Sequence, residues 1–305
     1  MILVGFLVLI LAITTMIRIS IFDYFQGISI LFHNFCLVRL NFDFLSQAEL
    51  QALVCGKNFS NFETANLYMA SGLIHLFVVS GAHLLIIENF IVKFFSRNHI
   101  TTAYFIIIIL SIYALACKLN PPITRSLISV MVSMTIIRNH LRWPENFKIF
   151  VCGLLALLFN PSWIASVSLQ LSWLAAMVVS INSLYLSKEK IFLKQSFFFL
   201  ALFPLLIFFQ VPNPITILSN LIFAPILEFV LFPLGLLVWL IPPAYPLFDF
   251  LIKLLRVILK NFEFNTSPQG PLDMNLQVLV GWTVILLLHF YLHFKEMSLR
   301  RQFYV

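Results

Sequence analysis

The chain has 305 residues, of which 61% are hydrophobic and only 10% are charged, and its formal net charge is +7. Soluble globular domains carry roughly 25% charged residues, so this composition excludes a fold with a water-exposed surface all round. It predicts an all-α, polytopic transmembrane helical bundle, because helices in lipid satisfy their own backbone polar groups. The excess of lysine and arginine is interpreted first as a signal of membrane topology.

The first third of the chain is expected to contain both spanning and interfacial segments. Residues 1–17 are apolar and lack the basic start of a signal peptide, which predicts a retained transmembrane segment. Residues 19–38 are interrupted by Asp23 and His33, so they are expected to lie on the membrane or to re-enter it. Residues 39–70 are more polar and carry apolar residues at helical spacing, which predicts an amphipathic interfacial helix.

Eight further apolar segments are predicted to enter or cross the membrane. They are residues 72–95, 101–117, 123–137, 147–159, 162–185, 196–211, 218–241 and 275–294. Proline and glycine interrupt several of them, and broken or re-entrant helices are tolerated at membrane depth where they line a cavity or are buried in protein. The pattern favours a transporter or channel.

Residues 245–262 form a second predicted interfacial amphipathic helix, because Lys253, Arg256 and Lys260 recur at spacings of three and four. Three other basic groups fall on one side of the membrane if the segments between them span singly. They are Lys93 with Arg97, Arg138 with Arg142 and Lys148, and Lys188 with Lys190 and Lys194. The positive-inside rule makes that side cytoplasmic. The basic tail should join them, which requires an odd crossing or a re-entrant pair after residue 218.

The four cysteines contain no Cys-x-x-Cys pair, so a zinc or redox motif has no support. Cys117 and Cys152 lie in apolar runs and are interpreted as packing residues. Cys36 and Cys55 flank the first stretch expected outside the membrane. A disulfide between them is chemically allowed if that stretch lies outside the cytoplasm.

Polar residues gather in the segment that contains Gly72, His75, Ser80, Gly81 and His83. On an unbroken helix the two histidines would be about 80° and roughly 12 Å apart, and a break at Ser80-Gly81 could bring them closer. Buried polar groups in a bilayer tend to face an interior cavity. The alternative is hydrogen bonding between helices that pack closely at glycines. No third ligand has a spacing that suits a metal site.

Three further polar residues, Arg125, Gln170 and Asn220, stand in other apolar segments. A buried arginine costs roughly 2.5–3.5 kcal/mol on insertion scales. Arg125 lies only a few residues into its predicted helix, where a long side chain can extend to the interface instead. The sequence is therefore compatible with an Arg125 side chain that extends to the membrane interface and with one that has a functional role inside the protein.

Five short elements follow one another between about residues 50 and 240. They are Leu-Val-Cys-Gly56, Gly72-Leu-Ile-His75 through Ser80-Gly81-Ala-His83, Pro122-Ile-Thr-Arg125-Ser126, Asn160-Pro161 with Leu169-Gln170-Leu171-Ser172-Trp173-Leu174-Ala175, and Ser219-Asn220-Leu221 with Pro225 and Pro233-Leu-Gly235. In this order they resemble the signature of the ComEC competence domain. Ser126 stands where the family has alanine, and Leu169 and Trp173 stand for two phenylalanines.

The resemblance implies an inner-membrane channel that admits single-stranded DNA during natural transformation of a bacterium. It also implies partners: membrane lipids, a DNA receptor, a separate nuclease and a cytoplasmic helicase or translocase, and a possible oligomer. Full-length members of the family usually carry an OB-like and a metallo-β-lactamase-like domain. Neither is expected here, because the first stretch outside the membrane is too short for an OB fold and no His-x-His-x-Asp-His motif is present. Nuclease activity is therefore not expected of this chain.

The DNA path is predicted to include Gly72, His75, Ser80, Gly81, His83, Arg125, Gln170 and Asn220. No cofactor, metal or catalytic residue is expected. No Gly-x-x-x-x-Gly-Lys loop is present, so partners would drive transport. The predicted organisation is a membrane-associated N-terminal segment at 1–45, a channel domain at 46–295 and a basic cytoplasmic tail at 296–305.

Two other functions are compatible with the sequence. An intramembrane serine protease would use Ser80 as nucleophile and His289 as a distant base, although the glycine expected two residues before the serine is Val78. A small-solute transporter, or a paralogue with no role in DNA uptake, would use the same broken helices for another substrate.

Overall fold

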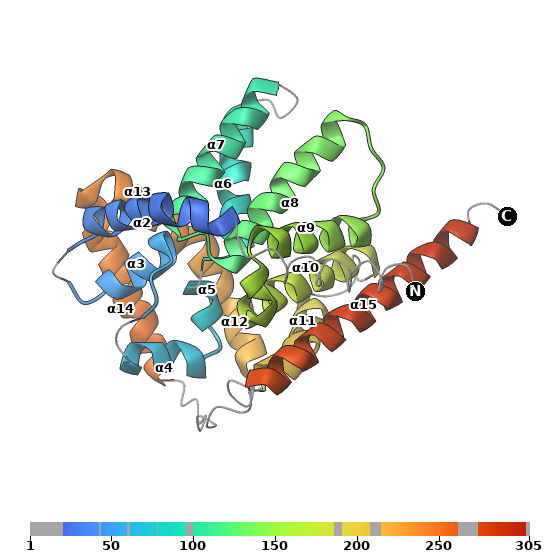
Figure 1. Ribbon diagram of the computed structural model, residues 1–305. Coiled ribbons are helices and arrows are strands. Elements are labelled where there is room, and N and C mark those ends of the chain that lie inside the picture. The colour runs from blue at the N-terminus through green and yellow to red at the C-terminus, as the bar shows by residue number, and fades with distance from the viewer. Residues whose placement is uncertain are drawn as a thin grey trace. The chain divides into compact units, whose positions relative to one another are not determined.

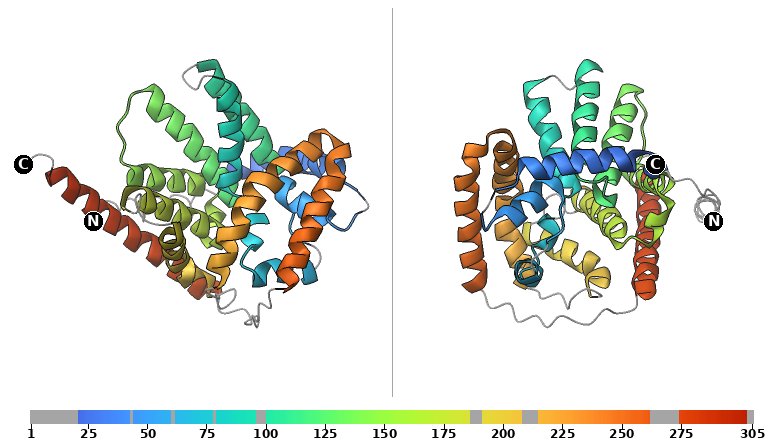
Figure 2. Two further views of the ribbon diagram at one scale, coloured as in Figure 1. Left: turned by 180° about the vertical axis from the view of Figure 1, so that it is seen from behind. Right: turned by 60° about the vertical axis from the view of Figure 1, so that its left-hand side comes forward.

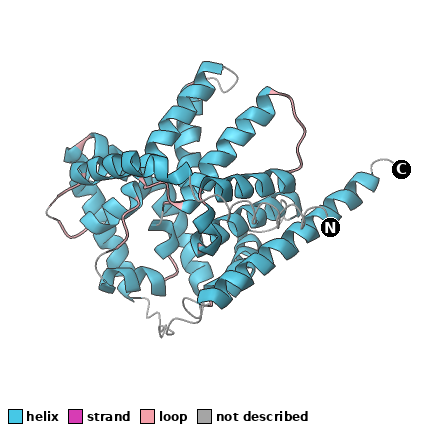
Figure 3. Ribbon diagram, viewed as in Figure 1, coloured by secondary structure: helices cyan, strands magenta, loops and turns pink. Residues whose placement is uncertain are grey.

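The computed structural model describes residues 21–42, 44–59, 62–77, 79–95, 100–185, 191–207, 215–261 and 274–302. Within these ranges the regular structure is helical and no strand is present (Figure 3), which confirms the all-α prediction. The segment expected at 1–17 lies outside the described residues, as do the basic residues Arg97, Lys188 and Lys190.

The helices are shown in chain order in Figure 1. They are α2 (Ile21–Arg39), α3 (Gln47–Cys55), α4 (Phe62–Ala70), α5 (Ile74–Phe77), α6 (Gly81–Phe94), α7 (Ile100–Ala116), α8 (Pro121–Arg138), α9 (Glu145–Phe159), η1 (Pro161–Ala165), α10 (Val167–Tyr185), α11 (Ile191–Leu206), α12 (Ile215–Ile226), η2 (Leu227–Leu231), α13 (Phe232–Leu240), η3 (Pro242–Ala244), α14 (Tyr245–Asn261) and α15 (Met274–Gln302). Of the three short elements, η1 and η3 are 3₁₀ turns and η2 is a π-helical turn.

The chain divides into two compact units. Unit 1 comprises Met1–Gln26, Thr124–Phe209 and Gly270–Val305. Unit 2 comprises Gly27–Ile123 and Gln210–Gln269. These units do not follow the boundaries predicted at residues 45 and 295, which stay predictions.

Three helical stretches in the described ranges are long and apolar enough to cross a membrane: Ile21–Arg39, Ile217–Leu240 and Asn275–Lys295. Shorter apolar helices accompany them, such as Thr101–Ala116. The chain is therefore a multi-pass helical membrane protein. The first of these stretches was expected to lie on the membrane or to re-enter it. Its 19 residues form one continuous helix of spanning length, because Asp23 and His33 do not interrupt the backbone, and its position in or on the membrane stays a prediction.

Unit 1 is held together by a core around the indole of Trp173, which is 1% exposed. Helices α9, α10, α11 and α15 contribute to this core. The indole lies directly against the backbone of Gly153 on α9, where a Cβ atom would overlap three atoms of its six-membered ring. Glycine at this position therefore allows α9 and α10 to approach closely.

We expect Gly153→Ala to destabilise unit 1 by about 1–3 kcal/mol, the usual cost of overpacking a filled core. The Trp173 ring cannot move aside cheaply, because its Nε1 donates a hydrogen bond of 2.9 Å to His289 Nε2. Thermal unfolding of the purified protein in detergent measures the effect. Gly27→Ala is the matched control, since nothing lies within 4 Å of a Cβ atom at that helical position. An equal response of the two variants would contradict the prediction.

Unit 2 is built around the short helix α3, which is buried on all sides from Glu49 to Cys55. The interfacial helix predicted over 39–70 is therefore wrong. The stretch forms two separate helices, α3 and α4, and α3 is a core element. Gly56 ends α3 in the left-handed region with φ 69°, and its N–H bonds back to Ala52 O. Gly235 of α13 packs closely on α3, because a Cβ atom at Gly235 would lie 2.7 Å from Val54 Cγ2.

Two pairs of helices flank this core. Helices α6 and α7 form a hairpin whose members lie side by side in the views of Figure 1 and Figure 2. Helices α13 and α14 are packed together as well. The helix predicted at 245–262 is confirmed as α14, although its location at the membrane interface stays a prediction.

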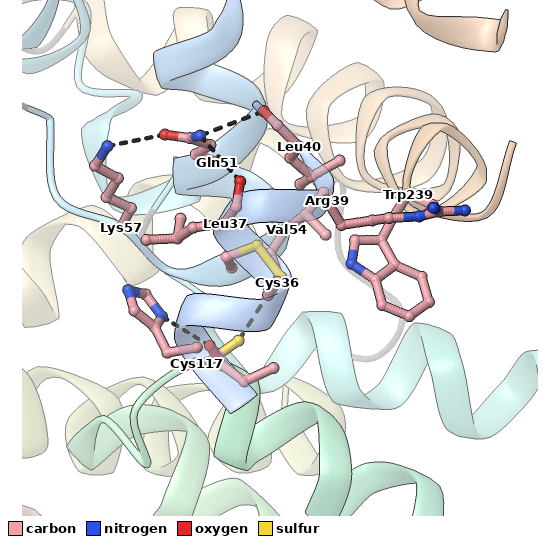
Figure 4. Close-up of a disulfide and its surroundings, with 12 residues drawn as sticks. Cys36, Leu37, Arg39, Leu40, Gln51, Val54, Lys57, Cys117 and Trp239 are labelled. Carbon is pink, nitrogen blue, oxygen red and sulfur yellow. Dashed lines mark hydrogen bonds between the residues drawn. A yellow bond between two sulfur atoms is a disulfide. The ribbon is translucent and has the colours of Figure 1, made fainter. Parts of the chain in front are cut away.

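A disulfide joins Cys36 of α2 to Cys55 of α3, with Cα atoms 6.0 Å apart (Figure 4). The sequence allowed this bond without requiring it. The thiol of Cys117 lies beside the bridge and donates to Val54 O at 3.7 Å (Figure 4). Cys117 and Cys152 are both buried and unbridged, as expected of packing residues.

Loss of this disulfide is expected to cost about 3 kcal/mol, the chain-entropy value for a loop of this length. Thermal unfolding of Cys36→Ser/Cys55→Ser should shift to lower temperature, and the purified wild type should shift equally after reduction. The double variant should not respond to reductant, which serves as the internal control. A wild type that is insensitive to reductant would contradict the prediction.

A buried ion pair ties α14 to α3. The carboxylate of Glu49 is fully buried and pairs with the guanidinium of Arg256. The hydroxyl of Tyr68 on α4 donates to the same carboxylate oxygen at 3.0 Å. Burial, together with the neighbouring Glu49 charge, raises the pKa of Tyr68 well above its ordinary value. Arg256 thus faces the protein rather than a basic outer face, which corrects the sequence interpretation of that residue.

A second polar contact lies near the start of α14. Ser46 donates to Asp249 at 2.7 Å, and Lys253 forms a 2.6 Å ion pair with the other oxygen of that carboxylate. Burial alone would raise the pKa of Asp249, but these hydrogen bonds outweigh it and hold the pKa below its ordinary value. The bond from Ser46 fixes α14 against the residue that precedes α3, whereas the Lys253–Asp249 ion pair lies within α14.

Candidate functional site

The site begins at the interrupted helix of unit 2. Gly72 adopts φ 73° in the turn after α4, α5 ends at Phe77, and α6 begins at Gly81. The predicted break at Ser80-Gly81 is therefore confirmed. It places the two histidines on different elements, with His75 exposed on α5 and His83 fully buried on α6.

Ser80 and His83 form a capping box at the start of α6. The Ser80 hydroxyl accepts from the N–H of Ala82 at 3.3 Å, and the Ser80 N–H donates to His83 Nδ1 at 2.9 Å. Glutamate or glutamine usually holds the position of His83 in this motif. Because Nδ1 accepts a hydrogen bond, the neutral imidazole carries its proton on Nε2. That nitrogen is buried and has no hydrogen-bond partner.

His83 packs against Phe232, the first residue of α13, which directly precedes Pro233 of another signature element. The two ring centroids are 4.2 Å apart, and Tyr113 of α7 packs on the same phenylalanine at 6.1 Å. The hydroxyl of Tyr113 is buried as well and interacts with the thiol of Cys117. Sequence reasoning missed Tyr113. Its signal is a single phenol near the end of the aliphatic run that precedes Cys117.

Helix α12 adds two more buried polar atoms without partners, Ser219 Oγ and Asn220 Oδ1. Asn220 was predicted as a path residue, whereas Ser219 was not, although it stands next to Asn220 in the same signature element. A buried polar group left without a partner costs about 1–3 kcal/mol. Such groups in a folded protein call for an explanation, which is often water, an ion or a ligand. Unit 2 therefore contains three unpaired polar groups within its signature elements, on His83, Ser219 and Asn220.

In unit 1 the structure brings two further signature elements together. Arg125 lies in the second turn of α8, and its Nε donates to Ser172 Oγ on α10 at 2.9 Å. Only 7% of Arg125 is exposed, so its side chain does not extend to an interface. This settles the choice left open by the sequence against the interfacial interpretation. Among the lysines and arginines whose side chains the structure describes, Arg125 alone is buried.

Gln170 lies two residues before Ser172 on α10 and is fully buried. Its Nε2 donates to Val278 O at 2.9 Å, while Oε1 has no partner. A Cβ atom on Gly281 of α15 would overlap that amide oxygen. Gly281 is thus a second residue that sequence reasoning missed. Its signal is an isolated glycine in the apolar stretch 275–294.

His289 of α15 is fully engaged in a hydrogen-bond network. Trp173 donates to its Nε2 at 2.9 Å, so the proton lies on Nδ1 and is donated to Asn146 Oδ1 at 2.5 Å. A general base needs a nitrogen that can take up a proton. His289 has neither ring nitrogen free for that role, which removes the base required by the protease alternative.

The eight predicted path residues are divided between the units. Gly72, His75, Ser80, Gly81, His83 and Asn220 belong to unit 2, and Arg125 and Gln170 belong to unit 1. In the part of the chain that the structure describes, no three His, Cys, Asp or Glu side chains gather as a metal site. The arrangement offers uncharged hydrogen-bonding groups at a helix break in one unit and a buried cation in the other.

These features define a helical membrane protein whose polar side chains are concentrated at interrupted helices. The family model described as competence protein matches residues 53–296. The chain therefore belongs to the competence protein family, which confirms the resemblance to the ComEC competence domain. No curated protein and no solved structure gives a match to this chain.

Proposed function

We propose that this protein forms the inner-membrane channel through which single-stranded DNA enters a bacterium during natural transformation. Membership of the competence protein family suggests a role in DNA uptake. One observation carries the channel itself: unit 2 holds buried polar atoms without partners on His83, Ser219 and Asn220. In a membrane protein such groups are expensive unless they face an interior path. Water or a passing strand would supply their missing hydrogen bonds.

A path lined mostly by uncharged groups suits a polyanion, because conduction requires binding that is favourable enough to admit the strand and weak enough to release it. Arg125 would supply one fixed positive charge, and Gln170 another amide. Cytoplasmic partners such as a helicase or translocase would provide the driving force. A DNA receptor and a separate nuclease would act before the channel, and membrane lipids or further copies of the chain would surround it.

The disulfide supports an orientation for unit 2. Disulfides form and persist in oxidising compartments outside the cytoplasm. In the proposed topology the Cys36–Cys55 end faces outward, and Lys93, at the far end of α6, faces the cytoplasm, in agreement with the positive-inside rule.

The test is uptake of fluorescent DNA by cells that lack the gene. Deletion is expected to abolish internalisation while DNA still binds at the cell surface. Complementation with His83→Ala should restore uptake only weakly. At equal protein level, DNA uptake should stay about 10-fold or more below that of the wild type. Normal internalisation in the deletion strain would refute the channel function and favour the small-solute transporter or the paralogue without a DNA role.

The protease alternative has its own test. A serine-directed fluorophosphonate should not label the purified protein, because His289 is committed to Asn146 and Trp173. Labelling that disappears in Ser80→Ala would revive that alternative.

A further inference from the structure

A cavity of about 190 Å³ lies in unit 2, apart from the unpaired groups around His83. It is lined by Gly56, Lys57, Asn58, Phe59, Ala65, Ile74, Phe77 and Asn120. Gly56 belongs to the first signature element and directly follows the disulfide cysteine Cys55. The volume is below the roughly 300–1,000 Å³ of pockets for drug-sized ligands, so it suits a single small ring system.

The backbone around the cavity is held in uncommon conformations. Gly56 is left-handed, and a side chain there would meet Val79, Cys117 and Asn120 within 3.3–3.6 Å. Directly before Asn120, Lys118 and Leu119 adopt φ values of 58° and 47°, which are rare for residues other than glycine. Strain of this kind concentrates at ligand clamps and other functional sites. Here it positions the amide of Asn120.

Lys57 supplies a positive charge at the rim of the cavity. Its Nζ donates to Gln51 Oε1 at 2.9 Å, and the Gln51 amide is itself oriented by a bond to Leu40 O at 3.3 Å (Figure 4). Lys57 is exposed and forms no salt bridge with a described acidic residue. Its charge is therefore held in place by a neutral partner, which leaves it able to bind an anion such as phosphate.

Aromatic rings form the other side of the cavity. Phe59 is half-buried, and its ring stacks on Tyr68 with centroids 5.6 Å apart. Phe77 contacts the ring of Phe59 edge-on, with centroids 5.4 Å apart. Aromatic side chains in such a setting bind unpaired bases by stacking, worth about 1–3 kcal/mol per base. The amides of Asn58 and Asn120 add donors and acceptors for base edges.

We propose that this cavity binds one nucleotide of an unpaired DNA strand, with the base against Phe59 and Phe77 and the phosphate at Lys57. The inference rests on the proposed DNA function and adds where the strand first contacts the protein. Bases within a duplex are paired and stacked, so only an unpaired base can enter such a cavity. The site lies beside the disulfide, at the end of unit 2 that the proposed orientation turns outward.

The experiment uses the full-length protein in nanodiscs and a dT oligonucleotide that carries one 5-iododeoxyuridine. Ultraviolet light should cross-link this base to the peptide that contains Phe59 or to the one that contains Phe77. In fluorescence anisotropy, Phe59→Leu and Lys57→Gln should each raise the Kd at least about fivefold. Lys57→Gln should also reduce the slope of log Kd against log salt concentration by the amount expected for about one phosphate contact.

Matched controls separate the site from general effects. Phe95→Leu and Lys93→Gln change exposed residues outside the cavity and should leave the Kd unchanged. Phe59→Tyr keeps the ring and should restore binding, which rules out misfolding as the cause of the Phe59→Leu effect. Excess unlabelled oligonucleotide should abolish the cross-link, whereas equimolar dTMP should not.

Absence of a cross-link in the cavity, with an unchanged Kd in both variants, would overturn the inference. Equal competition by dTMP would overturn it too, because the site would then bind a free nucleotide rather than a strand. Neither result touches the channel proposal, which depends on DNA internalisation in the deletion strain. Normal internalisation in that strain would refute the channel without altering the cross-linking result.

Discussion

Replacing Glu49 with alanine is expected to lower the free energy of unfolding by about 3–5 kcal/mol, the cost of removing one partner from a buried ion pair. Glu49 is fully buried and accepts bonds from Arg256 and from Tyr68. Its loss would leave a guanidinium that is only 21% exposed without a counter-charge and a buried phenol without an acceptor. Helices α3, α4 and α14 all meet at this carboxylate, so the whole of unit 2 should loosen.

Thermal unfolding in mild detergent, followed by circular dichroism, measures this loss. Glu145→Ala is the matched control, because Glu145 forms an ion pair with Lys148 while 53% of its side chain is exposed. Exposed pairs contribute about 0–1 kcal/mol, so this variant should unfold almost like the wild type. If Glu49→Ala were as stable as Glu145→Ala, the ion pair would not hold α14 to the core.

Arg125→Ala is expected to reduce DNA internalisation by roughly 10- to 150-fold, the factor that corresponds to 1.5–3 kcal/mol for a hydrogen bond to a charged group. Arg125 is buried, and its bond to Ser172 fixes its direction. In the proposed channel it offers a positive charge to a passing phosphate. Removing the charge should therefore impair uptake more than folding.

Two substitutions distinguish the role of the positive charge of Arg125 from the role of its orientation by Ser172. Arg125→Lys keeps the charge and should retain part of the uptake, although lysine cannot reproduce the planar guanidinium. Ser172→Ala keeps the arginine and removes only its partner, so its defect should be smaller than that of Arg125→Ala. Immunoblots of membrane fractions control for protein level. Wild-type uptake by Arg125→Ala and His83→Ala at wild-type protein levels would show that the assigned path is wrong.

Features encoded within a few neighbouring residues could be predicted from the sequence. The break before α6 follows from Ser80 and Gly81, since serine is a strong helix N-cap. Asn160 and Pro161 separate α9 from η1 in the same way, with the Asn160 side chain accepting from Ser162 N at 3.1 Å. The order of the five signature elements identified the family for the same reason, because each element is local.

The environment of each apolar helix could not be predicted. A helix face that meets lipid and one that meets protein are both apolar, so periodicity does not tell them apart in a membrane protein. Helix α3 shows this, because its sequence suggests an interface although the helix is buried on all sides. Tyr113 shows it as well, because nothing in its own segment reveals that it packs on Phe232, more than 100 residues later.

The sequence by itself determined that this protein is helical, lies in the membrane and belongs to the competence family, because composition, helix breaks and ordered motifs are local properties. Only the tertiary structure decided that Cys36 is bridged to Cys55, that Arg256 pairs with Glu49 and that Arg125 is held by Ser172. Each of these contacts joins residues on different helices. They form only when packing brings these helices together and excludes other partners for the same side chains. No pattern of neighbouring residues in the sequence specifies them.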